Sequence, residues 1–88
     1  MRMERPTEKE VQFEQVARIG KAVSSPKRLA LLDLLVQGEK SVEALAAELD
    51  IDIRLASAHL RELHQARLVA SRRDGRRIIY RLSGADVL

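Results

Sequence analysis

Arginines gather around the middle of one short segment, Leu68–Leu82, whose sequence is LVASRRDGRRIIYRL. A guanidinium is a permanent cation whose fork of N–H donors matches the oxygens of a phosphate group. Four of these side chains lie within six residues of one another: Arg72, Arg73, Arg76 and Arg77. Their type and spacing predict a surface that binds a polyanion, and a nucleic-acid backbone is the leading candidate.

The net charge of the chain has the same origin. Residues 1–66 hold 10 Lys and Arg against 11 Asp and Glu, whereas residues 67–88 hold 6 Arg against 2 Asp. A charged edge strand that prevents aggregation is the alternative explanation for such a patch. Lysine would serve that purpose equally well, so the use of arginine alone favours phosphate binding.

Other kinds of chemistry find little support. The 88 residues include no cysteine, which excludes disulfides and thiolate metal sites. His59 and His64 are five residues apart, about 140° around a helix, and do not form a metal-binding pair. We expect His59 to be a partly buried, hydrogen-bonded residue. Neither a nucleophile beside a base nor a phosphate-binding glycine loop is present, so we expect no enzyme activity, metal or cofactor. No run is apolar enough for a membrane span, which predicts a cytoplasmic protein.

The arginines require a β-hairpin to position them. Asp74-Gly75 is a preferred pair for a two-residue type I′ loop. That loop would pair Arg73 with Arg76, Arg72 with Arg77, and Val69 with Tyr80. One face would then carry Val69, Ile78, Tyr80 and Leu82, and the other Ala70, Ile79 and Arg81. Arginines directly opposite each other repel, so this register would need an external anion.

A first helix is predicted over residues 8–23, because Thr7 and Glu10 form a capping-box pattern before it. Its apolar stripe is wider than one small core requires, and we expect part of it to contact a second subunit. The predicted dimer interface comprises Phe13, Val16, Gly20 and Val23, which share a stripe with Ala17, and Val11 and Ile19 broaden the stripe.

Three more helices are predicted before the hairpin. Ser25-Pro26 begins the second, to about Gln37, which is apolar nearly all round and is expected to be the central buried helix. Ser41 caps a short third helix, and Asp52 caps a fourth from about 53 to 66. In the fourth, we expect burial of Ala56, His59, Leu60 and Leu63, and exposure of Arg54, Ser57, Ala58 and Arg61. Ile53 and Leu55 could either contact a ligand or pack against the neighbouring helix.

This order predicts a mainly α fold with a β-hairpin, a winged helix-turn-helix. The helix-turn-helix would span 41–66 and the wing 68–82, in one domain over 7–88 after a disordered 1–6. Ser83-Gly84-Ala85-Asp86 is a further capping pattern, which suggests a last helix cut short at Leu88. The predicted DNA contacts are Arg54, Ser57, Ala58, Arg61, Arg72, Arg73, Arg76 and Arg77.

Residues 20–82 resemble the ArsR/SmtB family of prokaryotic winged-helix repressors. The resemblance is carried by Pro26-Lys27-Arg28-Leu29, Ser41-Val42-Glu43, Ser57-Ala58-His59-Leu60 and the ending Tyr80-Arg81-Leu82. It implies a homodimer that binds a dyad-symmetric operator in double-stranded DNA, blocks transcription and releases the operator when an inducer binds.

The chain also departs from that family. Ser41 and Glu43 occupy the positions of a Cys-x-Cys metal sensor, and Gly84-Ala85-Asp86 does not match the Asp-x-His of a second site, so the inducer is unknown. Arg67 replaces the usual glycine after the fourth helix, which suggests that this helix ends differently. The alternative function is a winged-helix interaction module without specific DNA binding.

Overall fold

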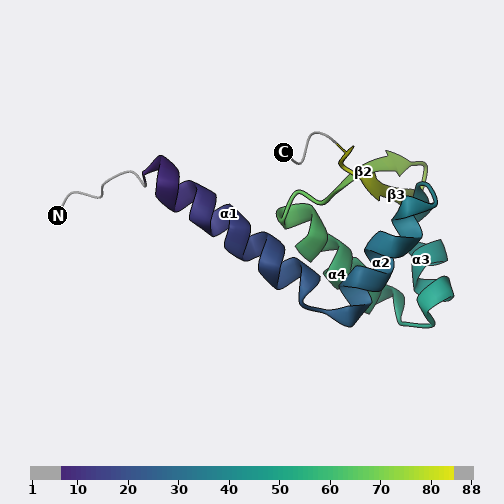
Figure 1. Cartoon of the computed structure of the whole chain (residues 1–88). Helices are drawn as coiled ribbons and strands as arrows, with labels where there is room; N and C mark the ends of the chain where they lie inside the picture. Colours follow the sequence, from purple (N-terminus) through teal and green to yellow (C-terminus); the bar gives the residue numbers. More distant parts are fainter. Residues whose placement is uncertain (1–6, 85–88) are drawn as a thin grey trace.

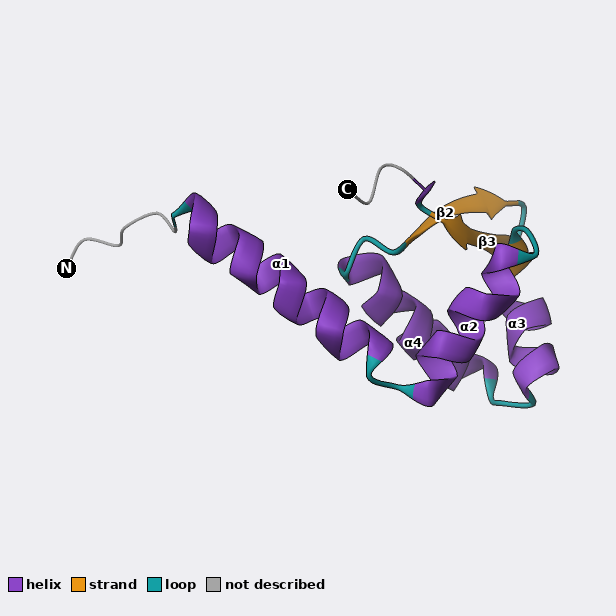
Figure 2. Cartoon of the chain, in the orientation of Figure 1, coloured by secondary structure: helices purple, strands orange, loops and turns teal. Residues whose placement is uncertain are grey.

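The structure, a computed structural model, describes residues 7–84, without the side chains of Glu8, Lys9, Val11 and Phe13. Four helices and a three-stranded antiparallel sheet form the described part of the chain (Figures 1 and 2). The expected disorder of residues 1–6 lies outside the described residues, as do Ala85 and Asp86 of the expected capping pattern at 83–86. In chain order the elements are α1 (Glu8–Val23), α2 (Pro26–Val36), β1 (Lys40–Ser41), α3 (Val42–Leu49), α4 (Ile53–Gln65), β2 (Val69–Asp74) and β3 (Arg77–Leu82). The predicted mainly α fold with a β-hairpin is confirmed.

Each predicted helix start is confirmed by a side-chain cap. Thr7 and Glu10 exchange the two bonds of a capping box at α1, each 3.1 Å long. The Ser25 hydroxyl accepts a hydrogen bond from the third residue of α2, and the Ser41 hydroxyl does the same for α3. At α4, the Asp52 carboxylate accepts the backbone N–H of Arg54 at 2.7 Å. These bonds satisfy donors that every helix leaves unpaired at its first turn.

Helix α4 ends in the ordinary way, so the expectation of a different ending at Arg67 is wrong. Arg67 adopts a left-handed conformation with φ of 64°. The backbone N–H of Leu68 donates to Leu63 O, and that of Arg67 donates to His64 O, each at 3.0 Å. These two bonds define a Schellman motif. Leu68 packs against the core that contains Leu63, and this contact helps to hold a residue without glycine's freedom in that conformation.

The hairpin differs from its predicted register. Asp74 pairs with Arg77, and the two-residue loop is Gly75-Arg76, with a positive φ only at Gly75. This is the pattern of a type II′ turn. The predicted Arg–Arg pairs are therefore wrong, and the repulsion that called for an external anion is absent. The observed register places opposite charges face to face at the loop, which is favourable.

The predicted faces of the hairpin survive this change, because the pairing moves by two residues and side chains alternate with a period of two. Val69 pairs with Leu82, and Ser71 with Tyr80, so these four side chains share one face of the hairpin. The sheet also gains a strand that was not predicted. β1 pairs with β3 through Lys40–Tyr80 and Ser41–Ile79, which gives the order β1-β3-β2.

One hydrophobic core joins the helices to the wing. Leu31, Leu45, Leu60 and Leu63 are its largest fully buried side chains, and Val69 and Tyr80 bring the wing into it. Helix α2 packs on α1, α3, α4 and β3, so its predicted central position is confirmed. Its predicted burial is confirmed on one side only: Leu31 and Leu35 are buried, but Leu29 and Val36 are exposed.

Helix α1 extends away from the rest of the molecule (Figure 1). Among the described side chains of α1, Ala22 and Ile19, in its last part, meet the core. Of the predicted dimer residues, Val16 is 67% exposed, Gly20 is exposed and Val23 is half-buried, whereas the side chain of Phe13 lies outside the described set. Val16 and Gly20 therefore present surface on α1 that no other described residue covers.

Candidate nucleic-acid interface

One side of helix α4 is polar and faces solvent, and the opposite side is apolar and buried. Ala56, Leu60 and Leu63 are buried, as predicted, while His59 is only half-buried. On the opposite side Arg54, Ala58 and Arg61 are exposed, and Ser57 is half-buried. These positions repeat at helical spacing along one side, so the predicted contact face is continuous and carries two cations and two small side chains.

The start of α4 also exposes apolar side chains. Ile53 is 43% exposed and Leu55 is 45% exposed, so neither is buried against the neighbouring helix. Packing into the core is thereby excluded for both side chains, and contact with a ligand stays a prediction. Large apolar side chains at the first turn of this helix can contact a thymine methyl in a major groove.

The wing arginines differ in what they contact. Arg73, Arg76 and Arg77 are exposed and form no ion pair with another described residue. Arg72 instead donates to the Glu39 carboxylate at 2.6 Å, across to the segment that precedes β1. This hydrogen bond and the charge of Glu39 raise the pKa of Arg72 above its ordinary value. Sequence reasoning missed this pair because it depends on β1 joining the sheet.

A hollow of about 330 Å³ lies between α4 and the wing. Its lining comes from one side of α4 and from the wing face that carries Ser71 and Tyr80: Arg61, His64, Gln65, Ser71 and Tyr80. Of these, only Arg61 was predicted as a binding residue. The observed pairing places Ser71 directly opposite Tyr80, whereas the predicted register would have placed the two diagonally on the same face.

Arg28 connects the end of α1 to α4. Its guanidinium donates to Ala22 O at 2.7 Å and to Lys21 O at 2.8 Å, and it lies 3.3 Å from His59 Nδ1. Arginine is only a donor, so Nδ1 accepts and the proton of the neutral ring is on Nε2. The expectation that His59 is a partly buried, hydrogen-bonded residue is confirmed. Burial and the charge of Arg28 hold the pKa of His59 below its usual value.

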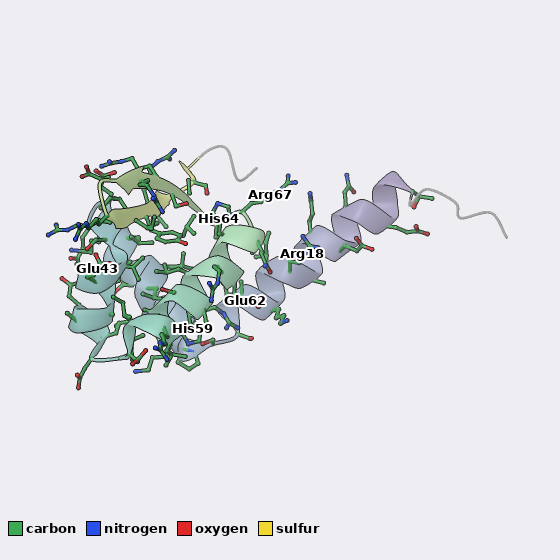
Figure 3. The ribbon with its side chains drawn as sticks, turned by 180° about the vertical axis from the view of Figure 1, so that it is seen from behind. Arg18, Glu43, His59, Glu62, His64 and Arg67 are labelled. Carbon is green, nitrogen blue, oxygen red and sulfur yellow. The ribbon has the colours of Figure 1, made fainter. Side chains whose placement is uncertain are left out.

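No group of three or more His, Cys, Asp or Glu residues that could hold a metal ion occurs among the side chains that the structure describes. Within residues 7–84, no helix is long and apolar enough to cross a membrane. Figure 3 shows His59 and His64 at different positions along α4.

A short helix, a tight turn, a second helix with an exposed polar face and an arginine-bearing hairpin define a winged helix-turn-helix protein. A family model described as "Bacterial regulatory protein, arsR family" matches residues 25–71, more than half of the chain. The chain belongs to this family of transcriptional regulators.

Similar proteins agree with this assignment. The chain is 48% identical over 75 residues to the HTH-type transcriptional regulator Rv0324 of Mycobacterium tuberculosis, covering 85% of this chain and 33% of that protein. It is 42% identical over 69 residues to the biofilm growth-associated repressor of Agrobacterium fabrum, covering 78% of this chain and 59% of the repressor. The chain thus spans about a third of the first relative and less than two thirds of the second.

A solved structure matches nearly all of the fold. It is the homodimeric winged helix-turn-helix DNA-binding domain, fragment 1–100, of Mb0332 from Mycobacterium bovis, a possible ArsR-family transcriptional regulator. The TM-score is 0.85 at 43% sequence identity, and the match covers 98% of this chain and 80% of that one.

Proposed function

We propose that this chain binds double-stranded operator DNA as a homodimer and represses transcription in the bacterial cytoplasm, until an inducer of unknown identity releases it. The observation that carries the proposal is the face of α4 on which Arg54, Ala58 and Arg61 are exposed. This face lies beside a wing whose Arg73, Arg76 and Arg77 have no ion-pair partner among the described residues. The contact residues would be Arg54, Ser57, Ala58, Arg61, Arg72, Arg73, Arg76 and Arg77.

The roles of these residues divide by chemistry. The face of α4 would enter the major groove, where arginine is the commonest reader of guanine and small side chains permit close approach. The wing arginines would contact phosphates or the adjacent minor groove and contribute affinity without sequence information. Arg72 would have to exchange the Glu39 carboxylate for a phosphate, so Arg72 should contribute less to the affinity for DNA than Arg73 or Arg76.

The dimer follows from the apolar surface of α1. Val16 is too exposed to stabilise a single chain, and a second copy packed along α1 would remove it from water. A two-fold dimer would place two α4 helices about one turn of DNA apart, which accounts for a dyad in the operator. The solved domain from Mycobacterium bovis, described as homodimeric, supports this arrangement.

The test is a fluorescence-anisotropy titration against duplexes tiled along the DNA upstream of the coding region, at two salt concentrations. We expect tight binding to one duplex with a dyad, and log K that falls steeply with log[salt]. An Arg73→Ala/Arg76→Ala variant should reduce that slope by about two. Weak binding that is equal on every duplex and unchanged in the variant would refute the proposal and favour a protein-interaction module.

The oligomeric state is tested separately by light scattering. We expect a molar mass of two chains, and a shift toward one chain in a Val16→Asp variant, because an uncompensated charge cannot be buried in an apolar interface. A mass of one chain at high protein concentration would refute the proposed dimer.

A further inference from the structure

Tyr80, which lines the hollow between α4 and the wing, has a hydroxyl without a hydrogen-bond partner among the described residues. Tyr80 is only 8% exposed, so its ring belongs to the core. Its hydroxyl makes no hydrogen bond to any other described residue, although buried hydroxyls ordinarily do. In the described residues, every side-chain oxygen or nitrogen that is fully buried has a hydrogen-bond partner. The Tyr80 hydroxyl is therefore accessible to solvent, and Tyr80 is one of the residues that line the hollow.

The other groups around this hollow are also donors. Arg61 provides a guanidinium, Gln65 an amide, His64 a ring nitrogen and Ser71 a hydroxyl. Ser71 is directly opposite Tyr80 on the same face of the hairpin, so both side chains lie on the side of the wing that lines the hollow. Figure 3 shows His64 near the C-terminal end of α4, beside the wing. Side chains from three separate elements, α4, β2 and β3, thus line one hollow.

The lining contains no carboxylate. A second hollow, of about 430 Å³ between α1 and α4, differs because Glu62 lines it together with Arg18 and Lys21. A cation with several neutral donors and no carboxylate selects a ligand that carries negative charge and several acceptor oxygens. Phosphate meets both conditions, since charge-assisted bonds to its oxygens are stronger than neutral ones.

We propose that the hollow lined by Arg61, His64, Gln65, Ser71 and Tyr80 binds one phosphate of the DNA backbone. This inference rests on the proposed function and adds a site to it. The hollow lies between the exposed face of α4 and the wing, so a DNA strand that contacts both must pass over it. A phosphate held there fixes the position of α4 along the groove and specifies no base.

The decisive variant is Tyr80→Phe, which removes one hydroxyl and keeps the ring that packs in the core. Loss of a hydrogen bond to a charged group should weaken DNA binding by about tenfold for each half-site. The loss should be equal on the operator and on an unrelated duplex, because a phosphate contact carries no sequence information. The salt slope should not change, since the hydroxyl is neutral, whereas Arg61→Gln should reduce it by about one.

The phosphate itself is identified by a cycle of substitutions on both molecules. Duplexes carrying a single neutral methylphosphonate at successive positions are titrated with wild-type and Tyr80→Phe protein. We expect one position in each half-site at which the methylphosphonate weakens the wild type strongly and the variant much less. Methylphosphonates at all other positions are the internal control and should affect both proteins equally. Thermal unfolding of Tyr80→Phe verifies that the variant is folded.

Three outcomes overturn the inference while leaving DNA binding intact. Unchanged affinity of Tyr80→Phe would show that the hydroxyl binds nothing. Weakening that adds to the methylphosphonate effect at every position would show that the hydroxyl acts through the fold. Saturable binding of inorganic phosphate near Ser71 and Tyr80, detected by NMR and undiminished in the complex with operator DNA, would show that the site belongs to a free anion. Failure of the wild type to bind any duplex would instead refute the proposed function itself.

Discussion

Replacement of Arg28 by methionine should remove the connection between the end of α1 and the rest of the molecule. Arg28 donates to Lys21 O and Ala22 O at 2.8 and 2.7 Å, and both carbonyls belong to the last turns of α1. A cation at this end of a helix also stabilises the helix dipole. Methionine keeps most of the aliphatic stem and loses the donors and the charge.

The expected loss can be worked from these contacts. A hydrogen bond that involves a charged group contributes about 1.5–3 kcal/mol, and one of the two is exposed and should count for less. The freed carbonyls can bond to water, so no penalty for unsatisfied acceptors is added. We expect a decrease of about 2–3 kcal/mol in the free energy of unfolding, a large part of the ~5–15 kcal/mol of an ordinary domain.

The assay is urea unfolding followed by far-UV circular dichroism, at one fixed protein concentration because dimerisation couples stability to concentration. Lys27→Met is the matched control: it removes a neighbouring charge from the same turn, and Lys27 makes no hydrogen bond or ion pair with the described residues. If the two variants unfold within about 0.5 kcal/mol of each other, the contacts of Arg28 do not connect α1 to the body and the reasoning is wrong.

Three further predictions concern pH, the end of α4 and the wing. Burial, Arg28 and Lys27 lower the pKa of His59 from 6.5, so the unfolded chain binds more protons just below that pH. The contribution of neutral His59 to the free energy of unfolding should therefore be fully present above pH 6.5 and be lost as the pH falls below that value. A His59→Gln variant that keeps the same pH dependence in urea unfolding would contradict this. Arg67→Gly should raise the free energy of unfolding by about 0.5–1 kcal/mol by relieving the left-handed backbone, and equal or lower stability would show that no strain is stored there. Glu39→Gln should free Arg72, tighten DNA binding at low salt and steepen the salt slope by about one, whereas superimposable salt curves would show that Arg72 does not reach a phosphate.

The helix boundaries follow from the sequence because the signals that set them are local. The caps at Thr7, Ser25, Ser41 and Asp52 each bond to a backbone N–H two or three residues ahead. Such bonds form within one turn and require nothing from the rest of the chain. The buried face of α4 follows from helical spacing for the same reason, and so does the polar face opposite it.

The register of the hairpin could not be chosen from the sequence. Moving the pairing by two residues leaves Val69, Tyr80 and Leu82 on the same face, so the hydrophobic pattern is equally satisfied by both registers. Turn preference alone favoured Asp74-Gly75 as the loop. Only the whole sheet, with the Asp74–Arg77 pair at the loop and β1 along β3, selects the observed pairing.

The sequence by itself thus determined the order of helices, their ends, the arginine-rich wing and the class of ligand it suits. The tertiary structure decided which of these groups meet. Arg28 reaches His59 across 31 positions of the chain, and Arg72 reaches Glu39 across 33. The hollow at Tyr80 likewise needs α4, β2 and β3 together. Contacts of this range depend on how separate elements pack, and no periodicity within one element encodes them.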